Sequence, residues 1–349
     1  MRRLPCFLWC SMIWYLIRRV ALLIPTLLGI SVAVFLMVQM VPGDPALVML
    51  GERATPESLE MLRQELGLDQ PVHVQLWRYL KGLITGDLGR SIKSHTQVRD
   101  ELTARFPATF ELTVVSMLFA CGIGVTIGVI SAVRRGSVLD ALGMTASLAG
   151  VSMPIFWLGL VMILWFAVGL GAFPVSGRLG SFTYIPSVTG LFLVDSLLAG
   201  DLAAFVDVLH HLILPSITLG TVPAAVIVRM TRSSVLEVIQ EDYVRTAWAK
   251  GLSERAVIVR HALRNASIPV LTVISLQFGY LLGGAVITET IFAWPGIGRW
   301  LLLAVHARDF PAIQGGVVVV ATTFVTINLI TDLLYAWLDP RISYSGSGR

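Results

Sequence analysis

The chain has 349 residues, of which 55% are hydrophobic and only 14% are charged, and its mean hydropathy is +0.78. Soluble domains carry about 25% charged residues, so this composition excludes a soluble globular protein and predicts a polytopic membrane protein. The net charge of +4 does not indicate a nucleic-acid partner, because we expect the cations to follow membrane topology, and an odd set of cysteines (Cys6, Cys10 and Cys121) argues against a disulfide framework.

Six apolar stretches are long enough to cross the hydrocarbon core, which requires about 20 residues per helix. They do not alternate between apolar and polar residues as barrel strands do, so we expect transmembrane helices. The stretches are 14–40, 108–133, 138–170, 208–232, 265–290 and 312–338. Pro154 lies inside the third stretch and predicts a kink there, because proline removes a backbone donor. The predicted fold is all-α, with six transmembrane helices.

The distribution of Lys and Arg sets the expected orientation. Arg134 and Arg135 lie in the short connection between the second and third stretches, which places that connection in the cytoplasm. Both termini and the segment 233–264 then also face the cytoplasm. The first stretch continues to Met40 without a small-residue cleavage site, so we expect a retained anchor rather than a signal peptide. Met12 offers a second start, and 1–11 is expected to be a dispensable tail.

Two segments are expected outside the membrane. In 42–107, Thr55 and Pro56 supply a helix start, and apolar residues at helical spacing predict amphipathic helices over 56–66 and 72–84. These helices either lie on the membrane surface or form a docking face for an external partner, and the two readings are compatible. In the Gly- and Pro-rich loop 171–207, residues 189–200 are too short for a span and predict an interfacial helix or turn.

Several kinds of chemistry are absent from the sequence. No Gly-Lys pair occurs, so the chain lacks a phosphate-binding Walker motif, and any ATP hydrolysis must take place on another polypeptide. There is no Gly-x-Ser-x-Gly elbow and no His-Glu-x-x-His pattern. His210 and His211 are adjacent and project in different directions on a helix, which favours structural roles over a shared metal. We therefore expect a non-catalytic chain without a bound metal or cofactor.

Four polar residues fall within or near the apolar stretches and raise the question of a polar pathway. Glu111 and Asp332 lie near the ends of their stretches, where both can reach water. Gln277 and Asn328 are deeper, and either form interhelical hydrogen bonds or line a pathway. The small residues Gly124 and Gly128 favour close helix packing. For Gly279 and Gly283, in the fifth stretch, packing and a moving seam both remain open.

The segment 241–264 is a charged, amphipathic insert between two apolar stretches. Val244, Ala247 and Trp248 recur at helical spacing and predict a short helix with one apolar face. Gly251 predicts the end of that helix, and Ser253 predicts the N-cap of a second one. So short a helix is marginal in water and must pack on its own protein, in a partner's groove or on lipid headgroups.

These features together resemble the permeases of binding-protein-dependent ABC importers. The pattern Arg245-Thr246-Ala247-x-x-x-Gly251 is similar to the family's Glu-Ala-Ala-x-x-x-Gly loop, with Arg245 in place of its glutamate, as in the peptide-transport branch. Further matching motifs, which extend the resemblance over 12–342, are Pro42-Gly43-Asp44-Pro45, Gly86-Asp87-Leu88-Gly89, Met230-Thr231-Arg232-Ser233-Ser234, Glu289-Thr290-Ile291-Phe292-Ala293-Trp294-Pro295-Gly296-Ile297-Gly298-Arg299, Gln314-Gly315-Gly316 and Asp339-Pro340-Arg341.

The resemblance implies a type I importer permease that translocates short peptides, dipeptides above all. It implies three kinds of protein partner: a homologous second permease, two cytoplasmic ATPase subunits that bind ATP and Mg²⁺, and an extracytoplasmic solute-binding protein. It also implies that the coupling segment (233–264) contacts an ATPase subunit through Glu241, Asp242, Tyr243, Arg245, Thr246, Ala247, Lys250 and Gly251. Relatives with this scaffold carry oligopeptides, glutathione, nickel or haem, and a secondary transporter or channel is the alternative from another class.

The expected organisation follows from these elements. A tail over 1–11 precedes the first transmembrane helix and its extracytoplasmic loop, 12–107. The transmembrane core occupies 108–338 and includes the coupling segment, and a cytoplasmic tail occupies 339–349. Gln277, Gly279, Gly283 and Asn328 are the candidate residues of the pathway.

Overall fold

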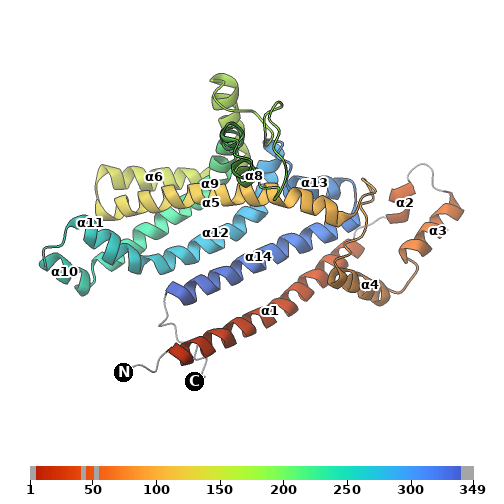
Figure 1. Cartoon of the computed structure of the whole chain (residues 1–349), viewed down its shortest axis with the longest axis horizontal. Helices are drawn as coiled ribbons and strands as arrows, with labels where there is room; N and C mark the ends of the chain where they lie inside the picture. Colours follow the sequence, from red (N-terminus) through yellow and green to blue (C-terminus); the bar gives the residue numbers. More distant parts are fainter. Residues whose placement is uncertain (1–4, 41–44, 51–54, 339–349) are drawn as a thin grey trace. The chain divides into compact units, whose positions relative to one another are not determined.

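The computed structural model describes residues 5–40, 45–50 and 55–338. These residues are almost entirely helical, with one isolated β-bridge between Arg90 and Gln97 (Figure 1). They form two compact units. Of the described residues, the first unit contains those up to Phe106 together with Arg299–Leu329, and the second contains Pro107–Gly298 and those from Ile330 to 338. The Pro42-Gly43-Asp44 motif and the predicted tail at 339–349 lie outside the described residues.

The first unit contains the long helix α1 (Pro5–Met40) and three shorter helices: α2 (Pro45–Leu50), α3 (Pro56–Leu66) and α4 (Val72–Thr85). The prediction of two amphipathic helices in this loop is confirmed. Thr55 caps α3 as expected, because its hydroxyl accepts from the amide of Ser58 while the Ser58 hydroxyl is within reach of the Thr55 amide. Gly67 and Gly86 end α3 and α4 in left-handed conformations.

Two buried carboxylates organise the segment between α4 and α5 (Val98–Val133). The Ser91 hydroxyl donates to Asp309 at 2.5 Å, which connects this segment to the start of α14 (Phe310–Leu338). Glu101 accepts hydrogen bonds from Ser94, Thr96 and the indole of Trp300 in α13 (Ile297–His306). The segment 91–101 is therefore held in place by Asp309 and by Trp300 of α13.

The second unit is built around α9 (Leu202–Ile239). Within the most apolar stretch of this helix, 72% is buried inside the protein. Around it pack α5, α6 (Val138–Ser152) and α12 (Leu263–Ile291), as Figure 1 shows. Helix α7 (Ile155–Met162) also contacts α9. A Cβ at Gly124 or Gly128 would lie within 3 Å of α9 atoms, so the predicted close packing at these glycines is confirmed. A bidentate pair between Arg232 and Asp140, 2.6 Å at its shorter contact, connects α9 to the start of α6.

The membrane spans agree in number with the sequence, with one marked difference in form. Among the described residues, five helices are long and apolar enough to cross a membrane, and a sixth span is obtained if α6 and the α7–η2 segment count together. This pair bends by 104° at Pro154, which is a break rather than the predicted kink. The π-helix η2 (Ile163–Gly169) follows α7, and the short helix α8 (Phe192–Leu198) confirms the helix expected in 189–200.

Candidate functional site

The coupling segment forms a helical hairpin at the end of α9. Helix α9 stops at Ile239, and α10 (Asp242–Ala249) begins after two residues. The return arm consists of α11 (Glu254–Ala256) and the π-helix η3 (Val257–Ala262), which continues into α12. The predicted helix–turn–helix geometry is therefore confirmed, and the hairpin lies at the opposite end of α9 from α8 (Figure 1).

A small apolar cluster fixes α10 to its own protein. Val244, Ala247 and Val257 are buried and pack together with Val238 of α9. Trp248, the third position of the predicted apolar face, lies outside this cluster and is 43% exposed. The buried face is narrower than the pattern suggested because only two positions of α10 contact η3 and α9. The indole is left available on the outer surface of the hairpin, together with the exposed side chains of Tyr243 and Leu252.

Gly251 makes the turn of the hairpin. Its φ is +75°, a conformation that costs residues with a Cβ about 1–2 kcal/mol, and a Cβ there would meet nothing within 4 Å. The Gly251 amide donates to Trp248 O at 2.9 Å, which closes the end of α10. Ser253 occupies the N-cap position as predicted, although its side chain makes no capping hydrogen bond.

The remaining predicted coupling residues are exposed on this hairpin: Glu241, Asp242, Arg245, Thr246 and Lys250. Arg245 and Asp242 approach to 3.5 Å, but their side chains are 72% and 96% exposed. The Tyr243 hydroxyl accepts a hydrogen bond of 2.6 Å from Asn265 in α12, which adds a polar connection between the two arms. The structure thus gathers all eight predicted coupling residues on one hairpin. Their contact with another protein stays a prediction.

The four candidate pathway residues are divided between the units. Gln277, Gly279 and Gly283 lie on α12, and Asn328 lies on α14 within the first unit. A Cβ added to Gly283 would meet nothing within 4 Å, so no close helix contact among the described residues requires this glycine. Gln277 and Asn328 are partly buried. A pathway through these residues stays a prediction.

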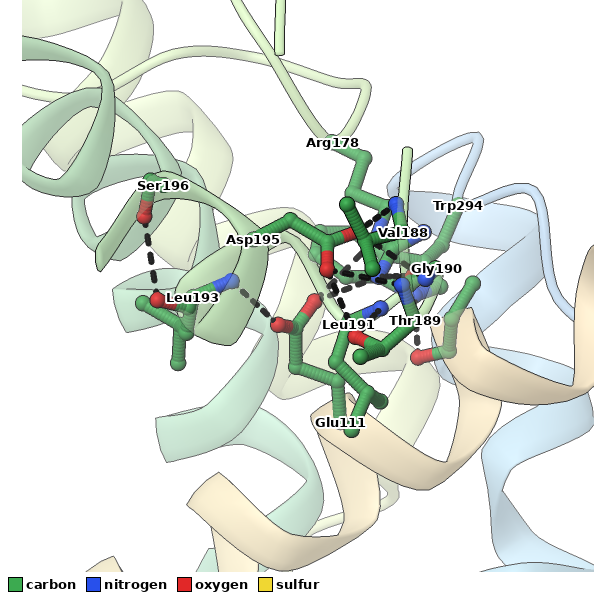
Figure 2. Close-up of polar contacts among 11 residues, drawn as sticks. Glu111, Arg178, Val188, Thr189, Gly190, Leu191, Leu193, Asp195, Ser196 and Trp294 are labelled. Carbon is green, nitrogen blue, oxygen red and sulfur yellow. Dashed lines mark hydrogen bonds and ion pairs between the residues drawn. The ribbon is translucent and has the colours of Figure 1, made fainter. Parts of the chain in front are cut away.

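At the other end of the second unit, a buried ion pair connects α5 to the loop before α8. Arg178 donates to Glu111 at 2.7 Å and 3.1 Å, and also to Gly190 O at 2.7 Å (Figure 2). The other Glu111 oxygen accepts from the Leu193 amide. The prediction that Glu111 reaches water was wrong, because its side chain is 4% exposed. The missed signal is that Arg178 is the only basic residue of 171–207.

Asp195 shapes the same loop from within α8. Its carboxylate accepts from the amides of Val188, Thr189 and Gly190 and from the Thr189 hydroxyl (Figure 2). Burial by itself would raise the pKa of Asp195, but these hydrogen bonds outweigh burial and hold the pKa below its ordinary value. The carboxylate therefore stays charged and holds the loop closed onto the N-terminus of α8.

The segment after α12 is positioned by the start of the second unit. Glu289 is fully buried and accepts a hydrogen bond of 2.6 Å from the Thr109 hydroxyl, which in turn accepts from the Ile297 amide. The Trp294 indole donates to Ala108 O at 2.9 Å. These contacts fix the Glu289–Arg299 motif, which the sequence marked only by its resemblance to a family.

The histidines and Asp332 complete the list of predicted positions. His210 lies 2.6 Å from Ala172 O, and His211 lies 2.8 Å from Asp207 O, so both make structural contacts to different parts of the chain. No group of three or more potential metal ligands occurs among the described residues. The side chain of Asp332 is not among those that the structure describes.

Comparison with known proteins decides the family. The family described as "Binding-protein-dependent transport system inner membrane component" matches residues 124–344, and its N-terminal companion family matches 12–113.

The chain belongs to this family. The permease is thus a multi-pass protein of the bacterial inner membrane.

Relatives of known name align with nearly the whole permease. It is 50% identical to the "Dipeptide transport system permease protein DppB" of Escherichia coli K12, over 95% of this chain and 99% of the relative. It is 51% identical to the "Di/tripeptide transport system permease protein DppB" of Pseudomonas aeruginosa, over 95% and 99%. It is 44% identical to the "Glutathione transport system permease protein GsiC" of Salmonella paratyphi A, over 95% and 100%.

A solved structure supports the fold of the permease. An inward-facing structure of the MetNI methionine ABC transporter superposes with a TM-score of 0.52 at 17% identity, and covers 68% of this chain and 96% of that chain. At this identity the similarity concerns the fold alone, and it agrees with the predicted type I permease fold.

Proposed function

We propose that the permease forms one half of the transmembrane translocation pathway of an ATP-driven importer of dipeptides. The support is the identity of 50–51% to dipeptide and di/tripeptide permeases, against 44% to a glutathione permease of similar coverage. A homologous permease would supply the other half of the translocation pathway. An extracytoplasmic solute-binding protein would deliver the peptide, and two cytoplasmic ATPase subunits would bind ATP and Mg²⁺.

The observation that carries the coupling role is the attachment of α10 at one end of a long helix. The path from Glu254 to Gly283 is helical without interruption, so a force on the hairpin acts directly on α12. The Val244–Val257 contact joins the hairpin arms, and the Val238 contact joins them to α9. When the ATPase subunits close on ATP, they would move α10, and the movement would reach α9 and α12 together.

The exposed surface of the hairpin supports a protein partner. An isolated helix of eight residues is unstable in water, and its own protein buries only one narrow side of α10. The aromatic rings of Tyr243 and Trp248 are each more than 40% exposed beside the charges of Asp242 and Arg245. Exposed aromatic residues within a polar surround are typical of interface anchors. We assign this surface to a groove on one ATPase subunit.

The test is purification from native membranes followed by reconstitution in liposomes. We expect the tagged permease to co-purify with a second permease and the ATPase subunits, and to import a labelled dipeptide only with ATP inside and binding protein outside. A control complex whose ATPase subunits carry a substituted Walker lysine should assemble and fail to transport. Transport by the isolated permease without ATP would overturn the proposal in favour of a secondary transporter or channel.

The substrate is tested separately from the energy source. In the same liposomes, a dipeptide, glutathione and a longer peptide compete for uptake with the cognate binding protein present. We expect the dipeptide to compete at the lowest concentration. Stronger competition by glutathione would be compatible with an ATP-driven importer but would identify glutathione, rather than a dipeptide, as its substrate.

A further inference from the structure

A cavity of about 610 Å³ lies within the first unit, at the end of α1 that the charge pattern places on the extracytoplasmic side. Its walls come from α1, the α3–α4 turn, α4, the 87–92 segment and the start of α14. Its volume is in the range of small-molecule sites, about 300–1,000 Å³. None of its lining residues belongs to the coupling segment or to the predicted pathway.

Charged side chains of both signs line this cavity, and several are held by their neighbours. The lining cations are Arg63, Arg78 and Arg90, and the lining anions are Asp69 and Asp87. The Arg78 guanidinium lies against Gly67, where a Cβ would be only 2.0 Å from Nη1. Arg90 donates to His95 O at 3.1 Å, and Asp87 accepts from the Gly89 amide at 3.0 Å. The cavity therefore presents charges of both signs, suited to a ligand with an anionic and a cationic group.

Tyr79 adds a buried hydroxyl to the lining. Its ring stacks on Phe35 of α1 with centroids 5.7 Å apart, and its hydroxyl has no hydrogen-bond partner among the described residues. Burial raises the pKa of Tyr79 to about 12, so the hydroxyl keeps its proton and can donate. Buried hydroxyl groups are normally paired, so the Tyr79 hydroxyl is a candidate donor to a ligand in the cavity.

The helices that form the cavity carry exposed apolar side chains. On α1, Leu36, Met37 and Met40 are exposed near the end of the first span, and on α4 Trp77 and Ile84 are exposed. Tryptophan is enriched at the level of lipid headgroups. A ligand in the cavity can therefore extend an apolar part along α1 into the hydrocarbon region.

We propose that this cavity binds the headgroup of an outer-leaflet phospholipid of the phosphatidylethanolamine class. The phosphodiester would accept hydrogen bonds from the arginines and from the Tyr79 hydroxyl, since guanidinium groups match phosphate oxygens in geometry and charge. The headgroup ammonium would face Asp69 and Asp87. The two carboxylates give the headgroup ammonium partners, which a headgroup without a cation would leave unused, and the apolar surface of α1 favours a lipid over free phosphate. The bound lipid would hold α4 against α1.

The experiment is native mass spectrometry of the purified importer complex. The complex is incubated with equal amounts of phosphatidylethanolamine, phosphatidylcholine and phosphatidylglycerol with identical acyl chains. We expect the wild-type complex to retain phosphatidylethanolamine preferentially. Replacing Arg78 and Arg90 together by Gln should reduce the retained lipid about tenfold, because charge-assisted hydrogen bonds are lost. The matched control is Arg99→Gln, an exposed arginine outside the cavity, which should retain lipid as the wild type does.

Two further variants keep the test independent of folding. Tyr79→Phe removes only a hydroxyl that has no partner among the described residues, so it should leave the unfolding temperature unchanged and still reduce retention. Asp69→Asn with Asp87→Asn keeps the acceptor for Gly89 and should shift selectivity towards phosphatidylglycerol. Equal retention in folded arginine variants, a wild-type preference for phosphatidylglycerol, or displacement by a millimolar dipeptide would overturn the proposal.

Discussion

The two ends of the second unit differ in how far their charged side chains are exposed. At the α8 end, Glu111 and Arg178 are 4% and 7% exposed, and the pair also bonds Gly190 and Leu193. At the hairpin end, Asp242 and Arg245 form a longer contact and stay largely in solvent. A buried pair must be satisfied by its own protein, whereas exposed charges remain available to another protein. The charges of the α8 end are therefore satisfied within the protein itself, whereas those of the hairpin end stay available for the proposed contact with an ATPase subunit.

The largest effect is expected from breaking the buried pair. Glu111→Ala would leave Arg178 charged and buried, so we expect a loss of about 3–5 kcal/mol in the free energy of unfolding. Denaturant titration of the purified permease in detergent measures it. Asp140→Asn is the matched control, since its partner Arg232 is 25% exposed and can reach water, and its loss should be smaller. Equal losses would contradict the contrast between buried and accessible pairs.

A second prediction concerns the carboxylate of Asp195. Because hydrogen bonds lower its pKa in the folded state, Asp195 stabilises the fold above its ordinary value of 3.8, and this stabilisation is lost as the pH falls through the lower folded value. Asp195→Ala should cost about 1.5–3 kcal/mol at neutral pH. Unfolding measured from pH 7 to pH 3 should show the difference between wild type and variant shrinking at the acid end. A difference in unfolding free energy that stays constant from pH 7 to pH 3 would contradict a stabilising role for the charge of Asp195.

A third prediction compares two glycines with the same backbone conformation. Gly251 and Gly136 have φ of +75° and +78°, and neither has an atom within 4 Å of an added Cβ. Valine at either position should therefore cost about 1–2 kcal/mol of unfolding free energy. Only Gly251→Val should reduce peptide uptake per ATP hydrolysed in reconstituted complexes. Equal uptake in both variants would count heavily against the coupling role of the hairpin.

The smallest effect on stability is expected on the exposed face of α10. Trp248→Ala removes a ring that is 43% exposed and outside the buried cluster, so unfolding should change by about 0.5 kcal/mol or less. Its effect should instead appear as weaker retention of ATPase subunits during purification. Val244→Ala is the opposite case, because it removes buried methyl groups. It should lower the free energy of unfolding more than Trp248→Ala does. Unchanged ATPase retention in the Trp248 variant would place the contact elsewhere.

Features set by local sequence were predicted well. The six apolar stretches, the cap at Thr55 and the turn at Gly251 depend on residues a few positions apart, and all three occur in the structure. The glycine spacing in α5 also predicted its close packing. The start of α9 at Leu202, six residues before the predicted span, follows from the cap by Asp201, whose carboxylate accepts from the Ala204 amide.

Features that depend on distant partners were missed or wrong. Glu111 lies 67 residues from Arg178, so its position near the end of an apolar stretch suggested water where the structure has a buried guanidinium. Trp248 shares its helical spacing with Val244, but only contacts with η3 and α9 decide which side is covered. The fixed angle of 104° at Pro154 likewise depends on packing against α9 and α12 that no local pattern contains.

The π-helix η3 has a consequence for how movement passes from the hairpin to the membrane. A π-turn holds one residue more than an α-turn, and each α-helical residue adds about 100° of rotation and 1.5 Å of rise. If Val257–Ala262 tightened into α-helical winding, its i→i+5 hydrogen bonds would be exchanged for α-helical ones, and α12 would rotate about its axis relative to α10. The connection would then transmit rotation as well as axial displacement to α12. A different side of α12 would face its neighbours after η3 changed from π-helical to α-helical winding.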